Sequence, residues 1–135
     1  MTWEPRPTPN VNPETKPYWE AASNERLLLQ ECQDCGLIYA YPRANCPDCF
    51  SDDVEWIDAE GTGEVYTYTV SRQMSGWPEK DLPLILAYVE LEEGPRITTN
   101  IVDCNPEDVE VGTSVKVQFV ETEDEDVGIP VFTPV

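Results

Sequence analysis

Alternating hydrophobic and polar residues predict a series of short β-strands in the second half of the chain. Val115, Val117 and Phe119, for example, take every second position of one segment, a spacing that places them on the same face of a strand. The strand-like segments are residues 64–72, 84–91, 96–102, 115–120 and 129–132. The second and third of these are joined by Glu-Glu-Gly-Pro at 92–95, a sequence typical of a hairpin turn.

Five short strands without an intervening helix predict a small barrel. No segment between the strands has a helical period long enough to serve as a crossover, which argues against alternating β- and α-elements. Among small barrels of five strands, the OB-fold is the expected architecture. The predicted fold class is therefore mainly β.

The first half of the chain has a different pattern. Prolines at 5, 7, 9 and 13 predict an extended arm. A short helix is expected next, because Thr15 suits its cap, Pro17 is tolerated in its first turn and Tyr18 and Trp19 supply an apolar side. Residues 25–31 and 37–41 are expected to form two further strands around a pair of cysteines.

Four cysteines in two CxxC pairs indicate a metal site. The pairs are separated by ten residues, 36–45, and the cysteines are Cys32, Cys35, Cys46 and Cys49. Two residues between cysteines let one tight turn direct both sulfurs at a single ion, and two such turns complete a tetrahedron. Because all four positions are filled by protein, none is open for water, and the predicted zinc is structural.

Other uses of these cysteines are a redox dithiol, two disulfides or an iron site. The paired spacing favours a metal over the first two, and no apolar leader that would indicate an oxidising compartment precedes the cysteines. Iron held by four thiolates has the same spacing, so the sequence leaves zinc and iron open. The expected division is an arm and short helix at 1–24, a zinc ribbon at 25–58 and an OB-fold domain at 59–135.

The charge of the chain is extreme. It carries 27 acidic residues against 8 basic ones, a formal net charge of −19. Nucleic-acid binding depends on lysine and arginine to neutralise phosphates, so this balance argues against the use most common for zinc ribbons. Acidic residues spread along the chain with few lysines also predict a halophilic, archaeal source, since concentrated salt screens their repulsion.

Several motifs together resemble the DUF35 family of OB-fold proteins with an N-terminal rubredoxin-like zinc ribbon. They are Tyr18-Trp19-Glu20, the two cysteine pairs with Gly36 and Pro42-Arg43, Glu55-Trp56, Gly61-x-Gly63-x-Val65-Tyr66, Val89-Glu90-Leu91-x-Glu93-Gly94 and Pro106-x-Asp108-Val109-x-Val111-Gly112. The resemblance covers nearly the whole chain beyond the arm. It departs at Ser71-Arg72, where relatives often have His-Arg.

The resemblance implies a non-catalytic accessory protein for acyl-CoA enzymes. The expected partner is a thiolase-type acetyl-CoA acetyltransferase, with a bridge to hydroxymethylglutaryl-CoA synthase in archaea. Coenzyme A is a further expected ligand, since Arg43 and Arg72 match family positions and Trp77 offers an aromatic surface for adenine or pantetheine. Each of these three residues also suits a purely structural role, offsetting carboxylates or capping the barrel.

Two other function classes are weaker. A nucleic-acid-binding module has tyrosines on its strands for stacking but lacks a basic groove. An enzyme has no support from histidine, phosphate loop or serine nucleophile motif, and no pair of carboxylates stands out. Because no apolar run reaches membrane-spanning length, we expect a cytoplasmic protein.

Overall fold

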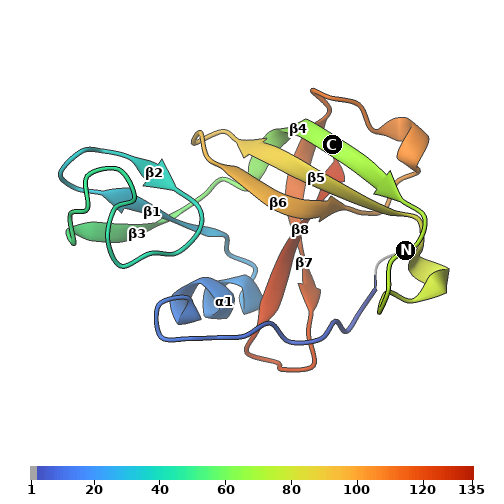
Figure 1. The fold of residues 1–135 in the computed structure, drawn as a ribbon, viewed down its shortest axis with the longest axis horizontal. Coiled ribbons are helices and arrows are strands. Elements are labelled where there is room, and N and C mark those ends of the chain that lie inside the picture. The colour runs from blue at the N-terminus through green and yellow to red at the C-terminus, as the bar shows by residue number, and fades with distance from the viewer. Residues whose placement is uncertain (1–2) are drawn as a thin grey trace.

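The computed structural model describes residues 3–135, which form a small three-stranded sheet beside a closed barrel (Figure 1). The small sheet contains β1 (Leu28–Cys32), β2 (Ile38–Tyr39) and β3 (Val54–Asp58), in the order β2-β1-β3 with antiparallel pairing. Strand β3 was not predicted from the sequence. It lies at the end of the stretch predicted as the zinc ribbon, and it pairs along its whole length with β1.

The barrel confirms the predicted fold class. Its strands are β4 (Thr62–Ser71), β5 (Leu84–Leu91), β6 (Arg96–Ile101), β7 (Ser114–Glu121) and β8 (Gly128–Pro134). They close in the order β4-β5-β6-β8-β7, with every pair antiparallel except β6 and β8. This mixed five-stranded barrel is an OB-fold. A register shift between Val65 and Thr67 bends the long strand β4, as a bulge does.

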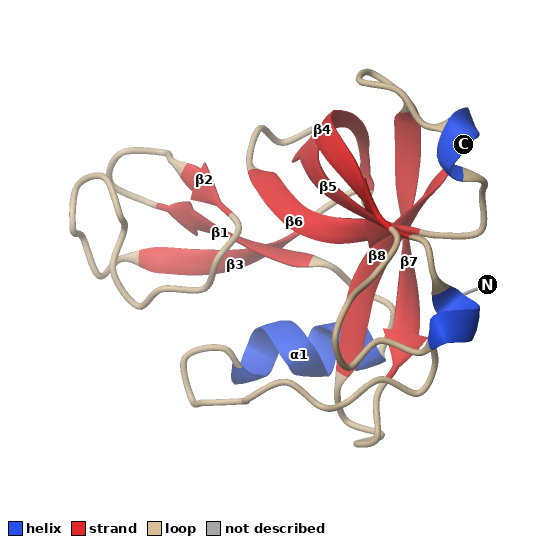
Figure 2. Ribbon diagram, turned by 45° about the vertical axis from the view of Figure 1, so that its right-hand side comes forward, coloured by secondary structure: helices blue, strands red, loops and turns tan. Residues whose placement is uncertain are grey.

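One helix, α1 (Lys16–Ser23), packs against strand β8 (Figure 2). Proline occupies the first turn as predicted, while the Thr15 backbone N–H is capped by the Asn12 side chain at 2.9 Å. The helix approaches β8 so closely that a Cβ atom at Gly128 would lie 2.7 Å from the Ala22 carbonyl oxygen. Glycine at this position therefore sets how near the helix can lie to the barrel.

The hydrophobic core of the barrel extends into the base of the small sheet. Leu27, Leu29 and Ala40 belong to the same buried cluster as Val89 and Phe132 of the barrel. The small sheet is therefore joined to the barrel by shared burial of apolar surface as well as by the chain itself.

Two short 3₁₀ helices interrupt the barrel loops, η1 (Glu79–Asp81) between β4 and β5 and η2 (Pro106–Asp108) before β7. The second occupies the turn predicted from Asn105-Pro106; the first was not predicted. No helix within residues 3–135 is long and apolar enough to cross a membrane. The division of the chain at 24/25 and 58/59 stays a prediction.

The N-terminal arm is extended, as predicted, and it is docked on the barrel. Arg6 forms a parallel bridge with Thr122 in the loop between β7 and β8. The Arg6 N–H donates to the Glu121 carbonyl, and the Glu123 N–H donates to the Arg6 carbonyl, both at 3.0 Å. Proline has no backbone N–H, so a proline-rich segment can form few hydrogen bonds within itself. The hydrogen bonds of the arm backbone at Arg6 are therefore formed with the barrel.

Candidate metal centre

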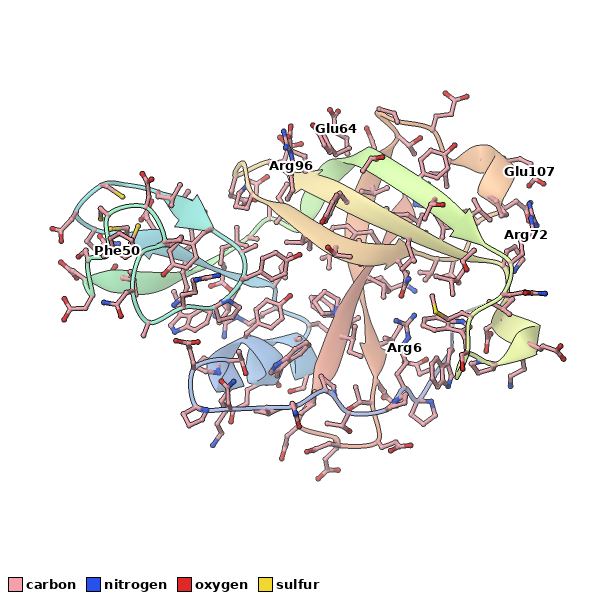
Figure 3. The ribbon with its side chains drawn as sticks, viewed as in Figure 1. Arg6, Phe50, Glu64, Arg72, Arg96 and Glu107 are labelled. Carbon is pink, nitrogen blue, oxygen red and sulfur yellow. The ribbon has the colours of Figure 1, made fainter. Side chains whose placement is uncertain are left out.

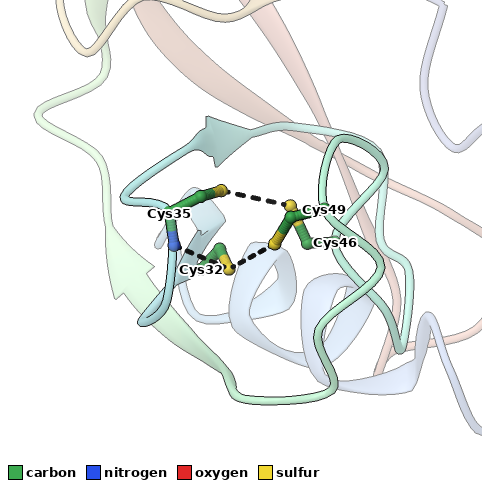
Figure 4. A group of neighbouring side chains, drawn as sticks. All are labelled: Cys32, Cys35, Cys46 and Cys49. Atoms are coloured by element: carbon green, nitrogen blue, oxygen red, sulfur yellow. Dashed lines mark hydrogen bonds between the residues drawn. The ribbon is translucent and has the colours of Figure 1, made fainter.

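The structure brings the four predicted cysteine sulfurs into one cluster (Figure 4). All four sulfurs lie within 4.8 Å of one another. Two of the distances are 3.5 Å, from Cys32 to Cys49, and 3.6 Å, from Cys35 to Cys46. A tetrahedral zinc with Zn–S bonds of about 2.3 Å requires sulfurs about 3.8 Å apart. The cluster therefore fits a four-thiolate zinc site with little adjustment.

The two cysteine pairs are held by turns of the same construction. In the first, the Gly36 N–H donates to the Cys32 carbonyl, and in the second the Phe50 N–H donates to the Cys46 carbonyl, both at 2.9 Å. Gly36 has φ 81°, and Phe50 has φ 63° at the equivalent position. A bulky residue seldom adopts this left-handed conformation. The turn therefore imposes the backbone geometry on whichever residue occupies the position.

Backbone N–H groups also point at the sulfurs. Cys32 receives a hydrogen bond from the Cys35 N–H, and Cys46 receives one from the Asp48 N–H, each at 3.4 Å. The hydrogen bond from Cys35 stabilises the Cys32 thiolate and lowers the pKa of its thiol to about 7. Such bonds favour the charged sulfur that binds a metal.

The neighbouring thiols resist further ionisation. The Leu37 N–H favours the Cys35 thiolate, but lost hydration and the adjacent sulfurs outweigh it and raise the pKa of Cys35 to about 12. Four sulfurs at these distances can all be ionised only when a cation offsets their repulsion. The donor set therefore calls for a metal ion.

The pairs are tied to each other beyond their sulfurs. The Ser51 hydroxyl donates to the Asp34 carboxylate, and the Gln33 N–H donates to the Asp53 carbonyl at 2.8 Å. Cys32 and Cys46 are buried, whereas Cys35 and Cys49 lie at the surface. No fifth metal-binding side chain joins the group among the described residues. A closed set of this kind suits a structural ion.

Cys104 lies apart from this cluster. Its side chain is half-buried and packs against the barrel core. Burial raises the pKa of the thiol, and the nearby Asp108 and Asp103 carboxylates raise it further. The chain also has no histidine to act as a base. These features suit a packing residue.

The residues predicted to contact coenzyme A lie in two places. Arg72 and Trp77 line one surface pocket of about 770 Å³ on the loop between β4 and β5. Arg43 lines a separate hollow on the ribbon with Tyr41 and Phe50. Figure 3 shows Phe50 and Arg72 at opposite ends of the molecule. Arg72 and Trp77 therefore share one pocket, and Arg43 lies in another.

Sequence analysis missed Lys80, which lines the same pocket as Arg72 and Trp77. Neither Arg72 nor Lys80 forms an ion pair within the described part of the chain. The sequence did hold a signal for Lys80. Basic residues are scarce in this chain, and two of them, Arg72 and Lys80, fall within nine positions of one loop.

Exposed aromatic side chains gather on the outer face of β4, β5 and β6. Tyr66 and Tyr88 are 46% and 47% exposed, and Tyr41 from the ribbon joins them at 55%. The Tyr41 hydroxyl lies 3.0 Å from the Thr98 backbone nitrogen and accepts its hydrogen. The Arg96 guanidinium lies 3.7 Å from the centre of the Tyr66 ring. These contacts hold the aromatic rings in fixed positions on an uncrowded surface.

Fold and cysteine cluster together define a protein made of a zinc ribbon and an OB-fold. Residues 19–55 match the family described as the rubredoxin-like zinc ribbon domain of ChsH2, and residues 56–120 match its C-terminal OB-fold domain. The first match supports structural zinc as the ion of the four-cysteine site. The chain belongs to the DUF35 family.

Relatives and solved structures agree with this assignment. A DUF35 domain-containing scaffold protein of Methanocaldococcus jannaschii is 44% identical over 69% of this chain and 67% of its own length. A probable enoyl-CoA hydratase alpha subunit of Thermomonospora curvata is 37% identical over 96% of this chain. A chain of the Ltp2–ChsH2(DUF35) aldolase structure superposes with a TM-score of 0.81 and 36% identity, over 93% of this chain and 98% of that one.

The present chain spans about 40% of the length of the hydratase alpha subunit that it matches. The similarity therefore concerns the ribbon and barrel, and the rest of that subunit has no counterpart in these residues.

Proposed function

We propose that this protein is a non-catalytic scaffold for an acyl-CoA enzyme. The observation that carries the proposal is the match of ribbon and barrel together to proteins named as scaffolds, as a hydratase subunit and as part of an aldolase structure. These proteins share the ribbon and barrel, although their names refer to different reactions, those of an enoyl-CoA hydratase and of an aldolase. A part shared among different reactions supports a role in assembly.

The zinc in this proposal is structural and is held by the four cysteines. Their closed, tetrahedral arrangement offers no open position for a substrate. The metal would supply folding free energy to the ribbon, whose outer turns have few buried apolar side chains. It would thereby keep Tyr41 and Phe50 in place at the surface.

The proposed partner is a thiolase-type acetyl-CoA acetyltransferase, with hydroxymethylglutaryl-CoA synthase as a second enzyme. Support for docking comes from the face that bears Tyr66, Tyr88 and Tyr41, because exposed aromatic residues commonly anchor protein interfaces. The charges on this face are also nearly balanced, since Arg96 pairs with Glu90 at 2.9 Å. A partner can approach it without meeting the full repulsion of a chain carrying −19.

This docking is tested by mixing the protein with the two enzymes of its own host at high salt and measuring complexes by size-exclusion chromatography. Tyr88→Glu should abolish the complex, because it places a charge in the middle of the aromatic face. Val111→Glu is the matched control, since Val111 is 68% exposed and lies outside that face. Equal complex formation by both variants would remove the face from the interface, and no complex with the unmodified protein would refute the proposed partners.

We further propose that Arg72, Lys80 and Trp77 contact coenzyme A. Two cations without ion pairs and one indole line the same pocket, which suits a phosphate-bearing ligand with an aromatic base. Arg43 lies too far away to join them and would contact a different part of the ligand or the partner.

Calorimetry with coenzyme A tests this contact. Replacing both Arg72 and Lys80 with alanine should weaken binding at least tenfold, on the order of 1.4 kcal/mol. Lys116→Ala, which removes one charge from strand β7, should leave the affinity nearly unchanged. If unmodified protein does not bind, the ligand is wrong; if the double variant binds equally well, the pocket is wrong.

The acidic surface supports a halophilic habitat for this chain. Carboxylates that repel one another in dilute buffer should be screened in concentrated salt. Stability against urea should therefore rise steadily from low to molar KCl. A maximum of stability in dilute buffer would contradict this proposal.

A nucleic-acid-binding role, the alternative suggested by the OB-fold, gains no support from the geometry. The aromatic face carries Glu64 and Glu90 against a single cation, Arg96, which stacks on Tyr66 and pairs with Glu90. Single-strand binding requires a continuous basic groove beside the aromatic residues.

A further inference from the structure

Within the described residues, the loop between β4 and β5 has one hydrogen bond to a barrel strand, from the Ser71 hydroxyl at the end of β4 to the Gln73 carbonyl at 2.9 Å. Within the described part of the chain, the hydrogen bonds formed by residues 72–82 stay between residues 71 and 82. They include the Trp77 N–H to the Met74 carbonyl at 3.1 Å and the Asp81 N–H to the Pro78 carbonyl at 3.0 Å. What fixes this loop against the rest of the molecule must therefore be side-chain contact.

Two residues of the N-terminal arm supply that contact through Trp77. The Trp3 ring meets the Trp77 ring edge-on, with the ring centres 4.9 Å apart. The Arg6 guanidinium lies 5.1 Å from the centre of the Trp77 ring. Figure 3 shows Arg6 at the end of the molecule where the loop also lies. Aromatic pairs in edge-on contact and a guanidinium over an aromatic ring are both contacts that stabilise folded proteins.

Arg6 is itself inserted into the barrel surface. It is 7% exposed, and its Nη1 donates to the Asn100 Oδ1 at 2.8 Å. Asn100 belongs to β6, so the guanidinium joins the arm to the barrel wall on one side and to Trp77 on the other. Its Nε donates to the Trp3 carbonyl at 3.1 Å, which fixes the arm's own backbone.

The buried guanidinium lacks an ion-pair partner among residues 3–135. No carboxylate lies within 4.0 Å of it. Loss of water on burial lowers the pKa of Arg6, while Asp81 and Glu4 offset part of that effect from a greater distance. Burying a charge without a direct counter-ion is costly. This cost offsets much of the free energy that the contacts of Arg6 with Asn100 and Trp77 contribute to docking of the arm.

The polar groups around Arg6 are also incompletely paired. The Trp77 Nε1 and the Asp81 Oδ2 are buried and have no hydrogen-bond partner, and both residues line the same small cavity as Arg6. That cavity has a volume of about 30 Å³, similar to the share of one molecule in liquid water. Unsatisfied groups of this kind reduce the free energy that holds a contact together.

From these contacts we propose that residues 3–8 form a releasable strap, with Arg6 as its latch, that holds loop 72–82 against the barrel. Docking of the strap keeps Trp77 in place and with it the pocket that contains Arg72 and Lys80. Release of the strap lets the loop move, so that Arg72, Trp77 and Lys80 no longer line one pocket. A protein that binds the arm can thereby alter the pocket without contacting it. This inference requires neither coenzyme A nor the proposed partner enzymes.

Hydrogen–deuterium exchange on the zinc-loaded full chain tests the strap. Arg6→Ala should raise exchange in residues 72–82 and 121–123 by about tenfold or more, because local opening of both segments becomes easier. Lys16→Ala is the matched control: Lys16 pairs only with Glu20 at the exposed start of α1, and its loss should leave both segments unchanged. Arg6→Lys, which retains the charge but lacks a planar guanidinium, should lie between the two.

Trp3→Ala provides a second variant in case Arg6→Ala fails to fold. It removes the ring contact with Trp77 while leaving Arg6 buried, so exchange should rise in residues 72–82 and change little in 121–123. If loop exchange in a folded Arg6→Ala or Trp3→Ala protein equals that of the unmodified protein, the loop does not depend on the arm and the strap is refuted.

Discussion

The outer turns of the ribbon and the barrel are stabilised by different means. In the barrel, fully buried side chains such as Val65, Val89 and Phe132 supply apolar area removed from water. In the turns at 32–50 the buried positions include Cys32 and Cys46. Their sulfurs form one cluster with the sulfurs of Cys35 and Cys49. A segment too small to enclose an apolar core relies on a metal in its place.

The boundary between these two regimes lies inside the ribbon. Leu27 and Leu29 at its base share the barrel's hydrophobic cluster, whereas the cysteine turns lie beyond it. The base of the ribbon should therefore unfold with the barrel, and the outer turns should respond to the metal. The following predictions test this distinction, from the largest expected effect to the smallest.

Loss of zinc should disorder the outer turns and leave the barrel folded. Cys46→Ser removes one of four ligands, and structural zinc supplies on the order of 10 kcal/mol of binding free energy in small metal-dependent domains. Metal analysis should show less than one zinc per chain, and amide exchange should rise at 32–36 and 46–50 but not in β5 or β6. The variant should also fail to bind the partner enzymes.

Cys104→Ser is the control for this experiment, since Cys104 lies outside the cluster. It should keep its zinc. Unfolding of the entire chain on loss of zinc would show that metal and barrel form a single unit.

Leu29→Ala should destabilise ribbon and barrel together. Leu29 is fully buried within the shared cluster, and truncation of such a leucine costs about 2–5 kcal/mol. Urea unfolding monitored both at the base of the ribbon and in the barrel should show one shifted transition. Leu86→Ala, on the half-exposed outer face of β5, should cost less. Two separate transitions in the Leu29 variant would contradict the shared core.

Gly128→Ala should weaken the packing of α1 on the barrel. The new methyl group would lie 2.7 Å from the Ala22 carbonyl oxygen, so helix and strand must separate. Overpacking of this kind costs about 1–3 kcal/mol. Thermal unfolding should show the loss, and amide exchange should rise in α1 more than in the cysteine turns. Unchanged stability would mean that the helix shifts without cost.

The Tyr18 phenol should make stability fall at high pH. Burial raises the pKa of Tyr18 to about 12, with a smaller contribution from Tyr41, against about 10 in an unfolded chain. Its stabilising contribution is complete below pH 10 and is lost as pH rises toward 12, by at most about 2.7 kcal/mol. Urea unfolding of Tyr18→Phe should show a weaker fall over this range than unmodified protein. Equal slopes would place the phenol in water.

Particular strands show how far sequence patterns predicted this fold. The run at 84–91 has the same bounds as β5, because it is a nearly continuous apolar run and the hairpin turn at 92–95 marks its end. Strand β3 was missed because Val54–Asp58 has no fully buried residue and is recognisable only through its pairing with β1. The hydrophobic pattern of one segment indicates which of its residues are buried, but it does not indicate pairing with a strand that is distant in sequence.

The sequence by itself determined the cysteine cluster, the five-stranded barrel and the acidic surface, since each depends on spacing or composition that is local in the chain. Tertiary structure decided which predicted residues meet. It joined Arg72 and Trp77 with Lys80, separated them from Arg43, merged the base of the ribbon with the barrel core and docked Arg6 beside Trp77. These outcomes depend on contacts between residues far apart in the chain, such as Arg6 and Trp77 or Arg6 and Asn100, and only folding the whole chain establishes such contacts.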